Sequence, residues 1–177
     1  MEWKDLIMQN FENSLSILER TLKGLTQEDL NWQPKPDCNS IGWITWHLSR
    51  FLDWGSSLLS GEEQLWIKDG WYGRFNRPAD PADTGGRNTQ EQVVAFQSPD
   101  ADTLISYYQA ALEKFRNYVS TISSYDLDHK YDDIFAQRLP TLGSRVNLAI
   151  GELQQHLGQI GYIRGQLQGY GWMELNR

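Results

Sequence analysis

The chain has 177 residues, which is the usual length of one domain with a single hydrophobic core, so we expect one domain over residues 1–177. Its 23 acidic residues outnumber its 16 basic residues, giving a net charge of −7 without any basic cluster. This balance argues against nucleic acid or an anionic membrane as a partner.

A single cysteine, Cys38, excludes an internal disulfide and a multi-cysteine zinc site. The chain contains no run of about 18 apolar residues, so no membrane-spanning helix is predicted. The first residues lack the charged start and apolar middle of a secretory signal, and a cytoplasmic location is therefore expected.

The first helix is predicted over residues 3–24, where apolar residues recur at intervals of three and four. Gly24 is expected to end this helix. Thr26 then begins one short helical turn, and Pro34 and Pro36 mark a loop.

A second long helix is predicted over about 40–60, with Ser40 as its N-cap and Gly61 at its end. Residues 62–87 are rich in Gly, Pro, Asp and Trp, and cannot form a continuous helix. A segment this long inside a compact domain is usually functional or disordered. Its aromatic residues indicate a packed lid: Trp66, Trp71, Tyr72 and Phe75.

A short helix is predicted from Thr89 to about residue 97, where Ser98 and Pro99 interrupt it. A third long helix follows over about 100–123. Residues 124–142 are polar and irregular, and a last long helix over about 143–168 ends near Gly169. Four long helices without an alternating strand pattern predict an all-α four-helix bundle. The long crossover link between its second and third helices would allow those two helices to run parallel.

Eight tryptophans are many for this length, and several of them cluster around His47 or follow it in the link. Large aromatic side chains of this kind usually fill a helical core. The alternative is that some of them form the wall of a substrate pocket.

Three residues carry the chemistry: His47 in the second helix, and Glu152 and His156 in the fourth. The i,i+4 spacing of the latter two places both side chains on one helix face, one turn apart. Two imidazoles and one carboxylate would leave a bound metal with open positions, as in catalytic sites. The alternative is an ordinary Glu–His contact beside a core histidine. The third histidine, His129, lies in a polar loop and is expected to be solvated.

Two segments resemble the signature helices of the DinB/YfiT-like superfamily: Ser40-Ile-Gly-Trp-Ile-Thr-Trp-His-Leu48 and Leu153-Gln-Gln-His-Leu-Gly-Gln-Ile-Gly-Tyr-Ile-Arg-Gly165. The resemblance implies a metal-binding four-helix bundle with a long crossover link, and it implies a homodimer. Many members use three histidines. Here Glu152 occupies the first ligand position of the fourth helix, which is similar to the mycothiol-dependent maleylpyruvate isomerase branch and its His, Glu, His zinc site.

The ligand set suits Zn²⁺ best, with Fe²⁺, Ni²⁺ and Mn²⁺ as alternatives. The metal could ionise a low-molecular-weight thiol for S-transfer to a small electrophile or for its isomerisation, or it could activate water for hydrolysis. The resemblance implies the thiol chemistry. The competing hypothesis is a non-catalytic metal- or ligand-binding bundle of the stress-response type.

The site is expected to take a small-molecule substrate. Other side chains are weaker candidates for a role in it. Arg50 and Arg164 could hold a substrate or cofactor carboxylate, although a structural role is the alternative for each. Gln159 and Asn147 could orient the ligands. Arg74 and Arg77, in the link, are still weaker candidates for holding a carboxylate, and Cys38 is expected to be an incidental loop thiol.

Overall fold

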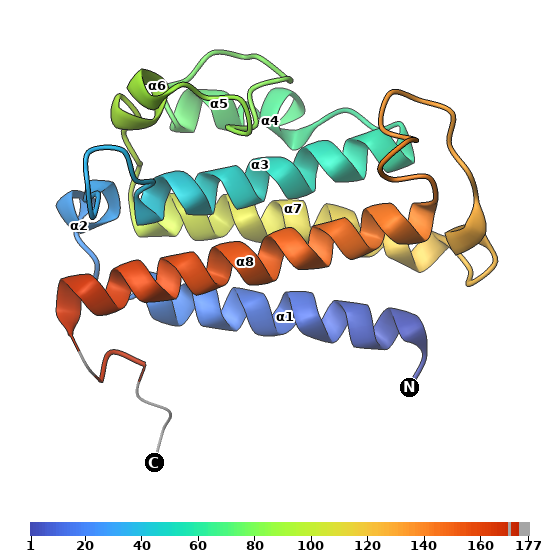
Figure 1. Ribbon diagram of the computed structural model, residues 1–177, viewed down its shortest axis with the longest axis horizontal. Helices are drawn as coiled ribbons and strands as arrows, with labels where there is room; N and C mark the ends of the chain where they lie inside the picture. The colour runs from blue at the N-terminus through green and yellow to red at the C-terminus, as the bar shows by residue number, and fades with distance from the viewer. Residues whose placement is uncertain (170, 174–177) are drawn as a thin grey trace.

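The computed structural model describes residues 1–169 and 171–173, and it is built around four long helices. These are α1 (Trp3–Leu22), α3 (Ile41–Ser60), α7 (Ala101–Thr121) and α8 (Leu142–Gln168), which lie side by side in Figure 1. The described residues form no β-strand. The predicted all-α four-helix bundle is therefore confirmed.

The crossover link determines the directions of the helices. In Figure 1, α3 and α7 run the same way, whereas α1 and α8 run the opposite way. α3 packs against α7 and α8, and α1 packs against the same two helices from the other side. The predicted parallel arrangement of the second and third long helices is thus observed. No helix among the described residues is both long and apolar enough to span a membrane.

The helix ends follow from their capping residues. Ser40 accepts a hydrogen bond from the backbone N–H of Trp43 at the start of α3, and Gly61 ends the helix with a φ of 76°. α1 ends at Leu22, two residues before the predicted end. α8 begins one residue earlier than predicted because Thr141 and Ser144 form a capping box.

The long link contains three short helices: α4 (Leu65–Lys68), α5 (Trp71–Arg74) and α6 (Gln90–Val94). They lie along one side of α3 (Figure 1), and Trp66, Trp71 and Phe75 are buried. The predicted packed lid is therefore observed. α4 and α5 had no helical signal in the sequence, and α6 ends three residues before the predicted position.

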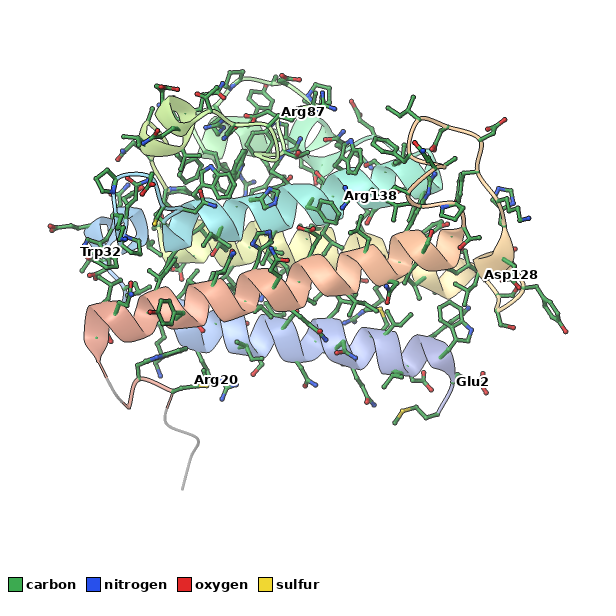
Figure 2. The ribbon with its side chains drawn as sticks, in the orientation of Figure 1. Glu2, Arg20, Trp32, Arg87, Asp128 and Arg138 are labelled. Atoms are coloured by element: carbon green, nitrogen blue, oxygen red, sulfur yellow. The ribbon has the colours of Figure 1, made fainter. Side chains whose placement is uncertain are left out.

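The remaining segments are short. α2 (Gln27–Asn31) is the predicted turn after Thr26, which caps it. The loop between α7 and α8 contains only the 3₁₀ turn η1 (Asp126–Asp128) and an isolated bridge between Lys130 and Thr141. Side chains fill the space between the helices (Figure 2), and the buried aromatic residues include Trp43, Trp46 and Trp66. These tryptophans are core residues, as the composition predicted.

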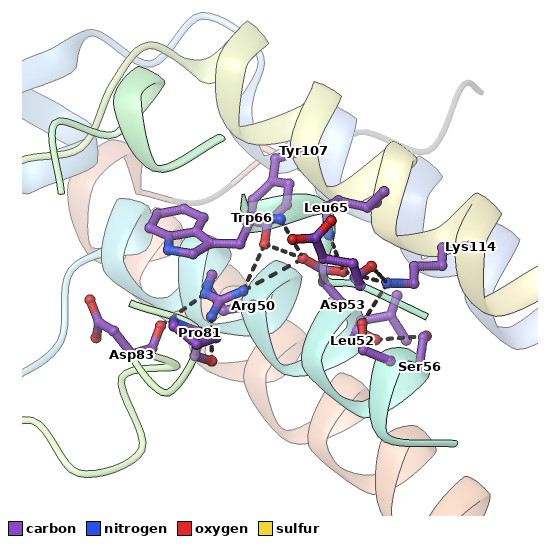
Figure 3. Close-up of polar contacts among 12 residues, drawn as sticks. Arg50, Leu52, Asp53, Ser56, Leu65, Trp66, Pro81, Asp83, Tyr107 and Lys114 are labelled. Carbon is purple, nitrogen blue, oxygen red and sulfur yellow. Dashed lines mark hydrogen bonds and ion pairs between the residues drawn. The ribbon is translucent and has the colours of Figure 1, made fainter. Parts of the chain in front are cut away.

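Asp53 anchors the beginning of the link to α3. Its carboxylate is fully buried and accepts hydrogen bonds from the backbone N–H groups of Leu65 and Trp66, both at 2.9 Å. The hydroxyl of Tyr107 and the ammonium of Lys114 also donate to it, at 2.9 and 3.2 Å (Figure 3). Burial raises the pKa of Tyr107 well above its usual value, so this hydroxyl keeps its proton.

Arg50 anchors the end of the same link (Figure 3). Its guanidinium donates to the carbonyl oxygens of Asp83 at 2.9 Å and Pro81 at 3.0 Å, and to the Tyr107 hydroxyl at 3.2 Å. It also lies 3.5 Å from the Asp53 carboxylate. The side chain is fully buried. Of the two roles considered for Arg50, these contacts support the structural one over holding a substrate carboxylate.

Candidate metal centre and pocket

The three predicted ligands meet between two facing helices. His47 comes from α3, and Glu152 and His156 come from α8. One ligand atom from each residue lies within 4.8 Å of the other two. Two ligand atoms of a tetrahedral zinc ion are roughly 3.3–3.6 Å apart, since each coordination bond is about 2.0–2.2 Å. Small side-chain rotations would therefore bring all three atoms to one cation.

Both histidines present the correct nitrogen to this point. Nδ1 of His47 donates to the carbonyl oxygen of Thr84, and Nδ1 of His156 donates to Oε1 of Gln159 at 2.7 Å. Because an amide oxygen can only accept a hydrogen bond, Nδ1 is the donor in each contact, and in a neutral ring the lone pair is then on Nε2. Nε2 of His156 lies 3.2 Å from the Glu152 carboxylate. The geometry therefore fits a divalent cation held by two Nε2 atoms and one carboxylate oxygen.

The surroundings keep His47 neutral. Burial lowers its pKa, and the nearby His156 lowers it further, while the hydrogen bond to Thr84 and the charge of Glu152 act in the other direction. The ring also stacks on Trp43, with 5.1 Å between ring centroids. A neutral imidazole is the form that coordinates a metal.

The crossover link reaches the centre at Thr84 and Gly85. Gly85 has a φ of 87°, and a Cβ atom placed on it would lie 2.8 Å from the Trp46 ring and 2.9 Å from the Trp43 ring. Only glycine can pass here, because the backbone crosses directly over the aromatic residues beside His47. This close approach brings the carbonyl of Thr84 to Nδ1 of His47.

We predict that Gly85→Ala destabilises the protein by about 1–3 kcal/mol more than Gly24→Ala, because only the first substitution overpacks the tryptophans. Gly24 has a similar φ of 74° but no atom within 4 Å of an added Cβ. Both substitutions place an alanine at a positive φ, which costs stability in each case. The difference between the two losses of stability therefore measures the clash with the rings. Chemical denaturation of the two variants measures it. Equal losses of stability would show that Gly85 is not confined by the rings.

A pocket of about 630 Å³ opens beside the centre, within the range of sites for small molecules. Two of the three ligands, His47 and Glu152, line it. Most of the other lining residues are apolar. The large ones come from α3, α7, α8 and the α7–α8 loop: Phe51, Leu52, Trp54, Leu58, Leu59, Phe115, Phe135, Leu139 and Leu148. Trp54, unlike the buried tryptophans, therefore forms a pocket wall.

The remaining residues considered from the sequence do not line the pocket, and of these Gln159 contacts one of the ligands. Arg164 is buried, donates to the Lys23 carbonyl oxygen at 2.9 Å and does not line the pocket. Asn147 is exposed, whereas Gln159 contacts His156 as anticipated. His129 is exposed. Cys38 does not line the pocket.

Sequence reasoning missed several residues of the site. The Thr84 carbonyl is a backbone group, and only the adjacent glycine pair signalled an unusual path there. Arg87 and Arg138 also line the pocket, and both come from irregular segments. Arg77 forms an ion pair with Asp83 at 2.7 Å next to this site. No spacing rule connects these residues with the histidines.

Comparisons with known proteins identify the family and a similar fold. A family model described as the DinB superfamily matches residues 10–160. A crystal structure of a conserved protein from Enterococcus faecalis is similar to this chain, with a TM-score of 0.85 and 26% sequence identity. That similarity covers 96% of this chain and 99% of the other. No curated protein matches the chain.

Proposed function

This chain belongs to the DinB superfamily, and we propose that it is a metal-dependent enzyme that activates a low-molecular-weight thiol for S-transfer or isomerisation of a small electrophile. The observation that supports the proposal best is the set of His47, Glu152 and His156 at the end of an apolar pocket. Zn²⁺ is the proposed ion, with Fe²⁺, Ni²⁺ and Mn²⁺ as alternatives. The ligand pattern, with Glu152 between the histidines, favours chemistry like that of the mycothiol-dependent maleylpyruvate isomerase branch.

A bound divalent cation would lower the pKa of a coordinated thiol below its free value of about 8.5 and supply a nucleophile at neutral pH. The chain itself orients the ligands and supplies apolar pocket walls. Thr84 and Gln159 hold the protons on Nδ1 of the two histidines, which keeps both Nε2 atoms available. The apolar pocket walls would exclude water from the reacting carbon.

Three protein ligands leave room for one more group beside the pocket. In S-transfer, the thiol sulfur forms a bond to the electrophilic carbon, the leaving group departs with its electron pair, and the thiol proton passes to solvent. In isomerisation, the sulfur adds and later leaves, so the thiol is regenerated. The small electrophile would occupy the space between Phe51, Trp54 and Leu148.

Calorimetric titration of the zinc-loaded protein with cysteine and glutathione tests the proposal. We expect thiol binding that requires the metal, is lost in His156→Ala and is retained in His129→Ala, whose side chain is exposed. S-Methylglutathione is the matched ligand control, because its sulfur cannot ionise.

Stoichiometric metal without affinity for either thiol would contradict the proposal. That result would favour the non-catalytic metal-binding bundle or, if the zinc-loaded protein cleaves small esters, the metal-dependent hydrolase. Homodimer formation and a cytoplasmic location stay predictions. Light scattering on the purified chain would test the first of them.

A further inference from the structure

The charged residues around the pocket differ in sign from the protein as a whole. The chain carries a net charge of −7, yet the pocket lining contains three arginines, Arg87, Arg138 and Arg145, against one carboxylate, Glu152. That carboxylate belongs to the metal ligand set. The pocket is therefore a local region of positive charge in an acidic protein.

One of these arginines is neutralised within the protein. Two nitrogens of Arg145 donate to the two carboxylate oxygens of Asp133, at 2.8 and 2.7 Å. Its guanidinium also lies over the ring of Tyr131, 3.7 Å from the centroid. Arg145 thus fastens the α7–α8 loop to α8 and is not available to a ligand.

The other two arginines have no such partner. Among the residues that the structure describes, Arg87 and Arg138 make no ion pair, no side-chain hydrogen bond and no stacking contact with an aromatic ring. Every other described arginine makes at least one of these contacts: Arg20, Arg50, Arg74, Arg77, Arg116, Arg145 and Arg164. Both arginines are exposed, and both residues line the same pocket.

These two arginines come from different parts of the chain. Arg87 lies in the crossover link, three residues after Thr84, and Arg138 lies in the loop before α8. Figure 2 shows both on the side of the bundle where α3 and these two segments lie. The pocket between them also has apolar walls, where Trp54 and Phe135 meet edge to face at a centroid distance of 5.7 Å.

We infer that the pocket binds a small organic acid whose apolar body contacts the Trp54 and Phe135 walls and whose anionic group pairs with Arg87 and Arg138. Guanidinium groups match the geometry of carboxylates and phosphates and form charge-assisted hydrogen bonds with both. The inference rests on the proposed function, because it names the substrate class of the same site. It places the anionic end of the substrate at the arginines and leaves the reacting end beside His47 and Glu152.

The test uses three probes with similar apolar bodies: 4-phenylbutyrate, 3-phenylpropyl phosphate and the uncharged 4-phenylbutanamide. Each is titrated by calorimetry into the full chain. We expect at least one acid to bind more tightly than the amide. The double variant Arg87→Gln/Arg138→Gln should weaken that acid by about 10- to 150-fold and leave the amide unchanged. Arg20→Gln, an exposed arginine on α1, is the control and should have no effect.

The two acids identify the anionic group, since the one that binds more tightly names carboxylate or phosphate. Equal affinity for acid and amide would overturn the inference, as would acid binding that the double variant does not change. If the acid bound the double variant as tightly as the unmodified protein but lost its affinity after chelator treatment, the anion would be bound to the metal instead.

Repeating the titration on chelator-treated protein separates this inference from the proposed function. Arginine-dependent acid binding by a protein that takes up no metal would retain the inference and refute the proposed function. Metal-dependent thiol binding without any preference for acids would support the proposed function and refute the inference.

Discussion

Substituting His156 by alanine or Glu152 by glutamine should abolish stoichiometric binding of zinc, while His129→Ala should leave it at one ion per chain. Each of the first two changes removes one of three ligands, and two remaining ligands cannot hold the ion tightly. Elemental analysis after dialysis against zinc and then against buffer measures the stoichiometry. His129 is a suitable control because it is exposed and lies outside the candidate ligand set.

We also expect these variants to differ in how much zinc raises their melting temperature. A ligand that binds only the folded chain at 100 times its dissociation constant stabilises it by about 2.7 kcal/mol. Zinc should therefore raise the melting temperature of the unmodified protein and of His129→Ala, but not of Glu152→Gln. An ordinary Glu–His contact makes the opposite prediction. In that case chelator would not change the melting temperature, and Glu152→Gln would behave like the control.

Asp53→Ala should be among the most destabilising single substitutions in the chain, at about 3–5 kcal/mol. The change removes a fully buried carboxylate and leaves two backbone N–H groups of α4 without their acceptor. It also takes away the anion that pairs with Lys114, whose ammonium keeps only the neutral acceptors Ser57 and Glu63. For a domain of this size the melting temperature should fall by roughly 6–20 °C. Thermal and chemical denaturation measure the loss, and Asp132→Ala, an exposed aspartate in the α7–α8 loop, is the matched control.

Asp53→Asn distinguishes the charge from the hydrogen bonds. Asparagine keeps one acceptor oxygen but cannot pair with both Lys114 and Arg50, so an intermediate loss is expected. If Asp53→Ala were no more destabilising than Asp132→Ala, the account of Asp53 as the anchor of the link would be wrong.

The long helices and the ligand set were predictable because both depend on local spacing. Apolar residues at intervals of three and four located α1, α3, α7 and α8 to within about two residues, and Ser40 marked the start of α3. The i,i+4 interval placed Glu152 and His156 on one face. No spacing rule connects them with His47, about a hundred residues earlier; that link was a hypothesis from ligand chemistry, which the resemblance to a family strengthened.

The structure of the crossover link was not predictable in the same way. It is held by Arg50 and Asp53, whose partners are backbone carbonyl and N–H groups 12 to 33 residues away. Every residue carries such backbone groups, so the sequence does not distinguish the ones that pair. For that reason the sequence left a substrate-binding role for Arg50 open beside a structural one, although its guanidinium is fully engaged with the link.

The pocket arginines show a related difficulty. Arg87 and Arg138 lie in irregular segments, where no periodicity assigns a face, and their common environment depends on how two loops fold over α3. Arg145 looks the same in sequence but is neutralised by Asp133, twelve residues earlier. Which arginines stay available to a ligand is therefore a property of the tertiary structure.

A crystal structure of the zinc-loaded protein, with an anomalous difference map collected at the zinc absorption edge, tests the central claim most directly. We predict one strong peak bonded to Nε2 of His47, Nε2 of His156 and a carboxylate oxygen of Glu152, at about 2.0–2.2 Å from each. A map in which zinc occupies another position, such as the exposed His129, and leaves these three side chains without an ion would contradict the account.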